Sequence, residues 1–175
     1  MVASLYAQAA APFTRVAVDW YRLTPMLVLL GAALFLLLGS ALTSDRWPCG
    51  LHAAVAVTAS SAAAVMAVLL WHDVDRHGTR SLVGGALSLD KFSLFLVVVI
   101  CASAALTALF LDDYLRREQL DAAEVQALVL LAAVGGVVMA MSSDLIVLFL
   151  GLETLSIVRT PKWPPQSRML RQRLG

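Results

Sequence analysis

The chain alternates between long apolar runs and short polar stretches. Four of these runs carry no charged side chain from one end to the other, and they cover residues 23–44, 53–71, 92–111 and 125–143. A helix needs about 20 predominantly apolar residues to span the hydrocarbon core of a bilayer. Each run is therefore expected to form a transmembrane helix.

A fifth apolar run, residues 145–158, is shorter than the others. As a helix it would be about 21 Å long, whereas the hydrocarbon core is about 30 Å thick. The two runs meet at a Ser-Ser-Asp segment, residues 142–144, so these two helices are expected to be antiparallel neighbours. The pattern predicts an all-α fold: a polytopic transmembrane helix bundle with four full spans and a shortened fifth, over residues 23–158.

Two polar tails flank the predicted bundle. The apolar run that follows the N-terminal tail, residues 1–22, is longer than the 7–15 residues of a signal peptide's apolar core. The C-terminal tail, residues 159–175, is basic, and Pro161, Pro164 and Pro165 prevent the helix from continuing into it. We expect this tail to be disordered or non-native, because a frameshifted or truncated reading frame would produce so abrupt a change.

The composition supports a membrane location. Hydrophobic residues make up 60% of the chain, charged residues make up 14%, and the mean hydropathy is +0.82. A soluble domain has about 25% charged residues. The net charge of +1 gives no basic footprint for nucleic acid. The bilayer is thus the expected partner, and nucleic-acid binding is excluded.

Small residues recur every four positions in two of the predicted spans. The second span holds Ala59, Ala63 and Ala67, and the fourth holds Ala132, Gly136 and Ala140. Such faces allow helix backbones to approach closely in a membrane. An alanine-rich composition alone explains either face equally well, so both interpretations remain open.

The longest loop, residues 71–91, gathers His72, Asp73, Asp75 and His77. Imidazole and carboxylate groups are zinc ligands, but this cluster has no typical ligand spacing. A solvated loop is therefore favoured, and no metal site is assigned.

The distribution of Lys and Arg predicts the orientation of the bundle. With five crossings, one side carries five basic residues and the other carries eight, five of them in the C-terminal tail. Because basic residues favour the cytoplasmic side, the C-terminus is expected inside and the N-terminus outside. Without the tail the balance becomes three against five, so the orientation depends on the tail.

Glu153 is the candidate functional residue, because it interrupts the apolar fifth run. It lies about 13 Å along a helix from Asp144, close to mid-membrane. A charged side chain there costs about 2.5–3.5 kcal/mol on insertion scales and indicates a functional site by default. Within its own helical face only Ser156 could hydrogen-bond the carboxyl group. The alternative is a shallow helix that leaves Glu153 near the headgroups.

Two segments resemble a known family. The stretch DYLRREQLDAAEVQALVLLAAVGGVVMAMSSDLIVLFLGLETLSI, residues 113–157, is similar to the fourth and fifth helices of subunit N of bacterial NADH:quinone oxidoreductase, respiratory complex I. LDKFSLF, residues 89–95, is similar to the start of the third helix in that family, and the resemblance extends over residues 18–157.

The resemblance implies a function for the chain. Glu153 falls on the family's fifth-helix glutamate, a proton-relay group paired with a lysine on the seventh helix. Glu124 matches the acid that opens the fourth helix, but Val125 and Gln126 stand where an aromatic pair usually follows. The chain is then expected to be a multi-pass subunit in the bacterial plasma membrane. It would contact the other membrane-arm subunits of complex I.

The resemblance also implies what the chain lacks. NADH, FMN, the iron–sulfur clusters and quinone belong to the rest of the complex, so no cofactor is expected in this chain. Family members have about fourteen helices, and the fifth normally continues beyond residue 157, so the chain is expected to be truncated and inactive alone. The alternatives are the homologous subunit of a cation/proton antiporter or membrane hydrogenase, and an orphan structural membrane protein.

Overall fold

The computed structural model describes residues 19–42, 50–78, 80–82, 85–118 and 122–157. Most of the predicted N-terminal tail, and all of the basic tail at 159–175, lie outside the described residues. The described elements are α2 (Thr24–Leu42), α3 (Leu51–His77), β1 (Arg80–Leu82), β2 (Leu87–Leu89), α4 (Lys91–Glu118), α5 (Ala122–Met141) and α6 (Leu145–Ile157).

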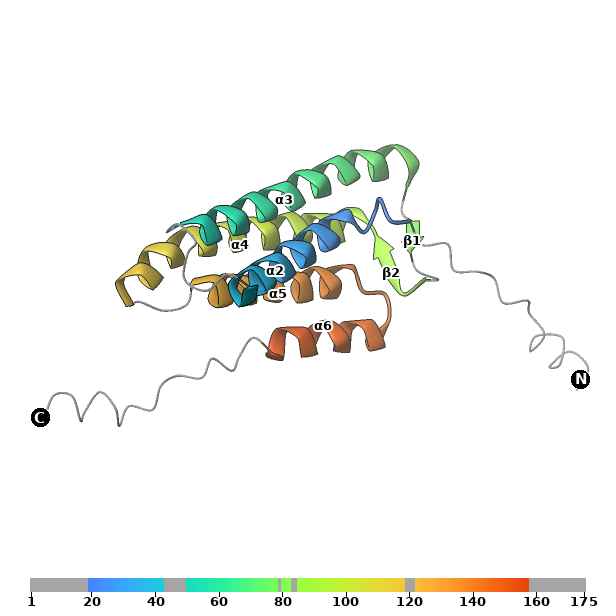
Figure 1. Cartoon of the computed structure of the whole chain (residues 1–175). Coiled ribbons are helices and arrows are strands. Elements are labelled where there is room, and N and C mark those ends of the chain that lie inside the picture. The colour runs from blue at the N-terminus through green and yellow to red at the C-terminus, as the bar shows by residue number, and fades with distance from the viewer. Residues whose placement is uncertain (1–18, 43–49, 79, 83–84, 119–121, 158–175) are drawn as a thin grey trace, which may run out of the picture.

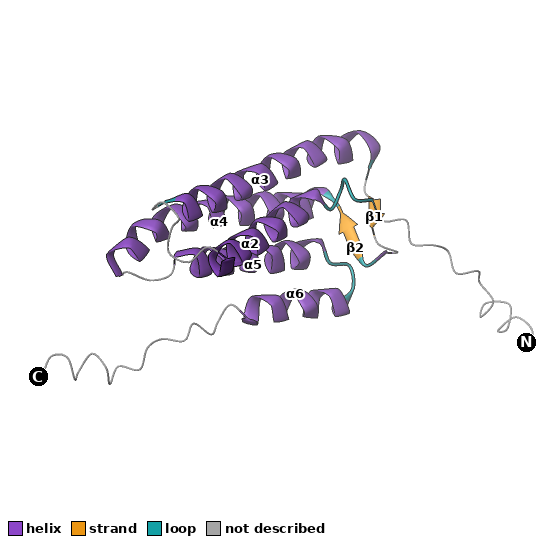
Figure 2. Cartoon of the chain, in the orientation of Figure 1, coloured by secondary structure: helices purple, strands orange, loops and turns teal. Residues whose placement is uncertain are grey.

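Helices dominate the described chain, as Figure 2 shows. Helices α2, α3, α4 and α5 are each long and apolar enough to cross a membrane, and α6 is a shorter apolar helix. The predicted fold class, a polytopic membrane helix bundle with a shortened fifth helix, is confirmed.

The four long helices form an up-and-down bundle in which each packs against its neighbours in sequence. Helix α2 also packs along α5, which closes the ring (Figure 1). Helix α6 packs chiefly against α5 and lies outside this ring. The predicted antiparallel pairing of the last two helices is therefore found.

The contact between α3 and α4 explains how the bundle packs. Buried positions in α3 recur at alternating spacings of three and four residues: Ala53, Ala56, Ser60, Ala63, Ala67, Leu70 and Val74. Helix α4 repeats the pattern with Leu94, Val97, Cys101, Ala104 and Ala108. This is the heptad spacing of a coiled-coil seam. Because most of these side chains are small, the backbones can approach closely without a hydrophobic driving force.

Helices α3 and α4 are longer than the predicted spans. The apolar runs at 53–71 and 92–111 lie within helices of 27 and 28 residues, which continue into charged segments. Hydropathy marks where a helix leaves the hydrocarbon core, whereas backbone hydrogen bonding lets the helix continue into water.

The prediction of a solvated loop over residues 71–91 is wrong, because α3 continues to His77 and carries His72, Asp73 and Asp75, and a β-hairpin follows it. Strands β1 and β2 pair antiparallel, and Leu82, Leu87 and Leu89 are buried. The backbone N–H of Ser143 donates to the carbonyl of Ala86 at 3.0 Å, which joins the hairpin to the turn between α5 and α6. We call this end of the bundle the hairpin end. The sequence interpretation missed it because strands of three residues give almost no periodic signal.

The start of α4 has a reciprocal cap. The backbone N–H of Ser93 donates to Asp90 Oδ1 at 2.8 Å, and the backbone N–H of Asp90 donates to Ser93 Oγ at 3.0 Å. Both bonds satisfy donors that the first turn of a helix would leave unpaired. The Asp and Ser of the LDKFSLF segment therefore have a structural role as helix-starting residues.

Candidate functional site

Helix α6, which carries Glu153, is held against α5 by a close glycine contact. Gly135 of α5 and Gly151 of α6 face each other, and a Cβ built on either one would lie 3.0 Å from the carbonyl oxygen of the other. A Cβ on Gly151 would also lie 2.6 Å from Met139 Cγ. The lack of side chains at these two positions thus allows the backbones to meet.

This contact fixes the depth of Glu153 relative to α5. Gly135 lies six residues before Met141, the last residue of α5, which corresponds to about 9 Å of helix. Because α6 runs antiparallel to α5, Glu153 lies about 3 Å deeper than Gly151. That level is close to the middle of the 20-residue helix α5, which is about 30 Å long. The geometry disfavours the shallow position.

The side chain of Glu153 lies on the outer surface of α6, facing away from α5. Gly151, two residues earlier, is buried against α5, and a step of two residues turns about 200° around a helix. The face that carries Glu153 also carries Ile146, Phe149 and Leu150, whose side chains are all more than half exposed. Among the residues that the structure describes, no hydrogen bond or ion pair involves the Glu153 carboxyl group.

Ser156 is not the partner that the sequence suggested. Its hydroxyl donates to the carbonyl of Leu152 at 3.1 Å, and the Thr154 hydroxyl donates to the carbonyl of Leu150 at 2.9 Å. Hydroxyls in apolar helices commonly bond the preceding turn in this way. The prediction that Ser156 could hydrogen-bond the Glu153 carboxyl group is therefore wrong.

Glu124, the second acid matched by the resemblance, lies elsewhere. It is exposed in the first turn of α5, at the end of the bundle opposite the hairpin. A carboxylate there interacts favourably with the positive end of the helix dipole. Glu124 and Glu153 therefore lie at different depths, and the structure does not bring them together.

The carboxylates of the His72–His77 cluster pair with cations from other elements. Arg22 Nη2 lies 3.3 Å from Asp73 Oδ2, and Lys91 Nζ lies 2.5 Å from Asp75 Oδ1. These contacts join the end of α3 to the residues before α2 and to the start of α4. Within the described part of the chain, no three His, Cys, Asp or Glu residues are arranged to hold a metal ion.

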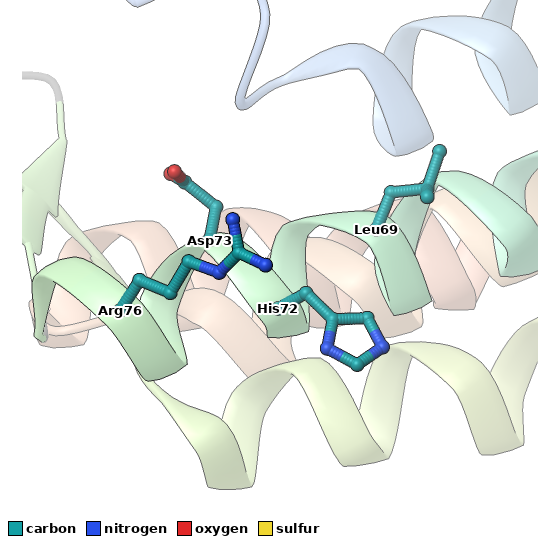
Figure 3. Close-up of a pocket in the computed structure, with 4 residues that line it drawn as sticks. All are labelled: Leu69, His72, Asp73 and Arg76. Atoms are coloured by element: carbon teal, nitrogen blue, oxygen red, sulfur yellow. The ribbon is translucent and has the colours of Figure 1, made fainter.

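A surface pocket of about 450 Å³ is lined by Leu69, His72, Asp73 and Arg76 of α3. Figure 3 shows that His72 and Asp73 point to different sides of the helix. The two potential ligands nearest in sequence thus diverge, which does not favour the zinc hypothesis.

The sequence interpretation assigned no role to two polar residues in the core. Ser60 of α3 and Gln126 of α5 are fully buried. Gln126 was noted only because it replaces an expected aromatic residue. An amide within an otherwise apolar stretch was the available signal, since buried polar groups in membrane helices need partners.

The described chain therefore has one carboxyl group at mid-depth, that of Glu153, and two buried polar residues inside the bundle, Ser60 and Gln126. A carboxyl group can bind and release a proton, but a transfer needs a second group within reach. On the outer face of α6, such a group would have to come from outside the described residues.

Comparison with known proteins finds several relatives that share one name. No protein-family model matches the chain. Curated proteins named NADH-quinone oxidoreductase subunit N are similar to it in several bacteria. The protein from Roseiflexus castenholzii is 37% identical over 142 residues, covering 81% of this chain and 27% of the relative. Those from Jannaschia sp. and Koribacter versatilis are 32% and 31% identical over 142 and 144 residues.

These matches cover most of the chain but only part of each relative. They extend over 79–81% of this chain and 27–28% of the relatives. The chain thus spans little more than a quarter of the length of the curated relatives it matches.

Proposed function

Because the chain belongs to the subunit N family of NADH-quinone oxidoreductases, we propose that it serves in the membrane arm of such a complex. The observation that carries this proposal is the similarity over about four fifths of the chain to proteins of that name. The apolar helices make the chain a multi-pass membrane protein, and the bacterial source of the relatives supports the inner membrane as its location.

The proposed partners are the other membrane-arm subunits and the surrounding lipid. The outer face of α6 supports a protein partner on that side, because it carries a carboxyl group at mid-depth among exposed apolar side chains. Redox chemistry is assigned to other subunits, which would bind NADH, FMN, the iron–sulfur clusters and quinone. A membrane-arm role for this chain therefore requires no nucleotide-binding motif in it.

Co-isolation tests the proposed assembly. A tagged version of the full chain is expressed in its source bacterium, and the membranes are extracted with a mild detergent. We expect other membrane-arm subunits of NADH-quinone oxidoreductase to co-purify with it. Recovery of the chain alone, or with subunits of a cation/proton antiporter, would contradict this proposal.

The proposed role of Glu153 is to pass protons at mid-membrane. Support comes from its depth beside Gly135, its outward direction, and the resemblance of LGLE to the family's fifth-helix glutamate. A charged carboxyl group in hydrocarbon is costly, so one placed there is a functional-site candidate. The matching lysine of the family would supply the second group of the relay.

Carbodiimide labelling tests whether Glu153 is a protonatable group within the hydrocarbon core. Dicyclohexylcarbodiimide is lipid-soluble and reacts with protonated carboxyl groups. In the full chain reconstituted into lipid, mass spectrometry should find the label at Glu153 and not at Glu124 or Asp144. The label should disappear in Glu153→Gln. Labelling of Glu124 with none at Glu153 would contradict a mid-membrane carboxyl group.

A further inference from the structure

Two fully buried polar atoms have no hydrogen-bond partner in the described protein. Gln126 Nε2 donates to the carbonyl of Ala108 at 3.0 Å, but Gln126 Oε1 has no donor. Ser60 Oγ has neither a donor nor an acceptor. The contrast with Thr58 is clear, because its hydroxyl donates to the carbonyl of Ala54 at 2.8 Å in the same helix. Buried polar atoms in proteins are almost always paired, with protein or with ordered water.

Both residues lie at the same level of the bundle. The Asp75–Lys91 ion pair joins α3 to α4 near the hairpin end and provides a common reference point. Ser60 lies 15 residues from Asp75, which is about 22 Å of helix. Ala108 lies 17 residues from Lys91, which is about 25 Å. The difference is less than one helical turn, and Gln126 bonds directly to Ala108.

Both residues also face the interior of the same bundle. Ser60 belongs to the buried stripe of α3, and α3 contacts both α4 and α5. The buried neighbours at this level include alanines on all three helices, with Leu130 one turn further along α5: Ala56, Ala63, Ala104, Ala108 and Ala127. Because these neighbours are apolar, the Ser60 hydroxyl and the Gln126 amide are the main polar side-chain groups of this layer.

We propose that Ser60 and Gln126 bind a buried water molecule that links α3 to α5. The water donates one hydrogen to Gln126 Oε1 and accepts the hydrogen of the Ser60 hydroxyl. Its second hydrogen is free for a backbone carbonyl of the same layer. Buried waters typically make about three such bonds to groups that the protein leaves unpaired. This hydration site lies inside the four-helix ring, whereas Glu153 lies on the outer face of α6, so the proposal does not depend on the relay role.

The direction in which Ser60→Ala changes the melting temperature distinguishes a water-bound hydroxyl from an unpaired one. If Ser60 holds the water, Ser60→Ala removes a partner and should lower the melting temperature of the full chain in lipid nanodiscs, by about 2–4 °C. If Ser60 has no partner, the same substitution removes a buried unsatisfied group and should leave the melting temperature unchanged or raised. The second result would overturn the proposal.

A double-mutant cycle tests the link between the two residues. Gln126→Met removes the amide with little change in shape, and combining it with Ser60→Ala should lower the melting temperature by less than the two single losses together. Additive losses would overturn the link. Ser103→Ala is the matched control, because that exposed hydroxyl donates to the carbonyl of Ile100 within its own helix. Its effect should add to that of Gln126→Met.

A structure determined by electron microscopy at a resolution that shows water gives a readout independent of folding. In the full chain with its partner subunits, density within hydrogen-bond distance of both Ser60 Oγ and Gln126 Oε1 is expected. A Ser60 hydroxyl bonded to the carbonyl of Ala56, with no density beside Gln126 Oε1, would overturn the proposal.

Discussion

Asp90 and Ser93 show how single residues start a helix at the membrane surface. The Ser93 side chain, and after it the Ser93 backbone N–H that donates to Asp90 Oδ1, lower the pKa of the Asp90 carboxyl group. The charged form is therefore favoured by folding. Its stabilising effect is complete above the unfolded-state pKa of about 3.9, and it is lost as the pH falls through the lower folded-state value.

We predict that this cap makes stability pH-dependent in the acid range. Asp90→Ala should reduce the free energy of unfolding by about 1 kcal/mol at neutral pH, because the N-cap acceptor is lost. Asp90→Asn keeps an acceptor oxygen without the charge, so it should cost less and should lose less stability than the wild type between pH 5 and 3. Melting temperatures in nanodiscs across that range measure the difference. Parallel pH profiles for the wild type and Asp90→Asn would contradict the cap's charge dependence.

Glu153 and Ser156 show what can be inferred about a residue from the sequence. The mid-depth of Glu153 followed from helix rise alone, because α6 begins where the Ser-Ser-Asp turn ends. The hydrogen-bond partner of Ser156 could not be predicted, since a hydroxyl in an apolar helix can donate either to a neighbouring side chain or to the backbone of its own helix. The water-bridging pair of Ser60 and Gln126 could not be found either, because their proximity depends on the register of helices distant in sequence.

At the scale of elements, glycines determine how α6 packs. The sequence analysis pointed to Gly136 with Ala132 and Ala140, whereas the closest approach uses Gly135 with Gly151. A Cβ on Gly136 would meet Ile100 of α4 at 3.4 Å, an ordinary contact. Spacing identified small residues correctly but not which of them meets another backbone. The rotation of a helix about its axis is set by all its neighbours together.

Gly151→Ala is predicted to weaken the docking of α6. The new methyl group would lie 2.6 Å from Met139 Cγ and 3.2 Å from the Met139 backbone nitrogen, so α6 or Met139 must move. Overpacking of this kind typically costs about 1–3 kcal/mol. Reversible unfolding of the full chain in mixed detergent micelles measures the loss.

The control for Gly151→Ala is Gly31→Ala in α2, where a Cβ would meet nothing within 4 Å. Because alanine is the better helix former, this variant should be as stable as the wild type or more so. Equal stability of both alanine variants would show that the α5–α6 contact is not close-packed at Gly151.

At the scale of the whole molecule, the order of the helices could be predicted from the sequence, but the packing of the helices does not determine the orientation of the bundle in the membrane. Helix α6 has 13 residues and is about 20 Å long, so whether it completes a fifth crossing decides on which side the C-terminus lies. The Lys and Arg count predicts an N-terminus outside and a C-terminus inside.

Single-cysteine labelling tests that orientation. In a chain whose Cys49 and Cys101 are replaced by alanine, Gln8→Cys should react with a membrane-impermeant maleimide in intact cells. Gln166→Cys should react only after the membrane is permeabilised. Equal reaction of both from outside would mean an even number of crossings and would show that α6 does not span.

Within the described helices, Glu153 is the one Asp, Glu, Lys, Arg or His that lies inside one of the five apolar runs. A path across about 30 Å of hydrocarbon needs several groups or waters within reach of one another. The function proposed for the chain therefore rests on Glu153 acting together with groups supplied by the rest of an assembled complex.

The most direct measurement is the number of protons pumped per NADH oxidised by an assembled complex that carries Glu153→Gln. The side chain keeps its shape but can no longer take up and release a proton. We predict normal assembly and NADH binding with pumping reduced at least about tenfold, whereas Glu153→Asp retains much of it and Glu124→Gln, at the exposed end of α5, leaves it unchanged. A Glu153→Gln complex that pumps at the wild-type ratio would contradict the proposed role of Glu153.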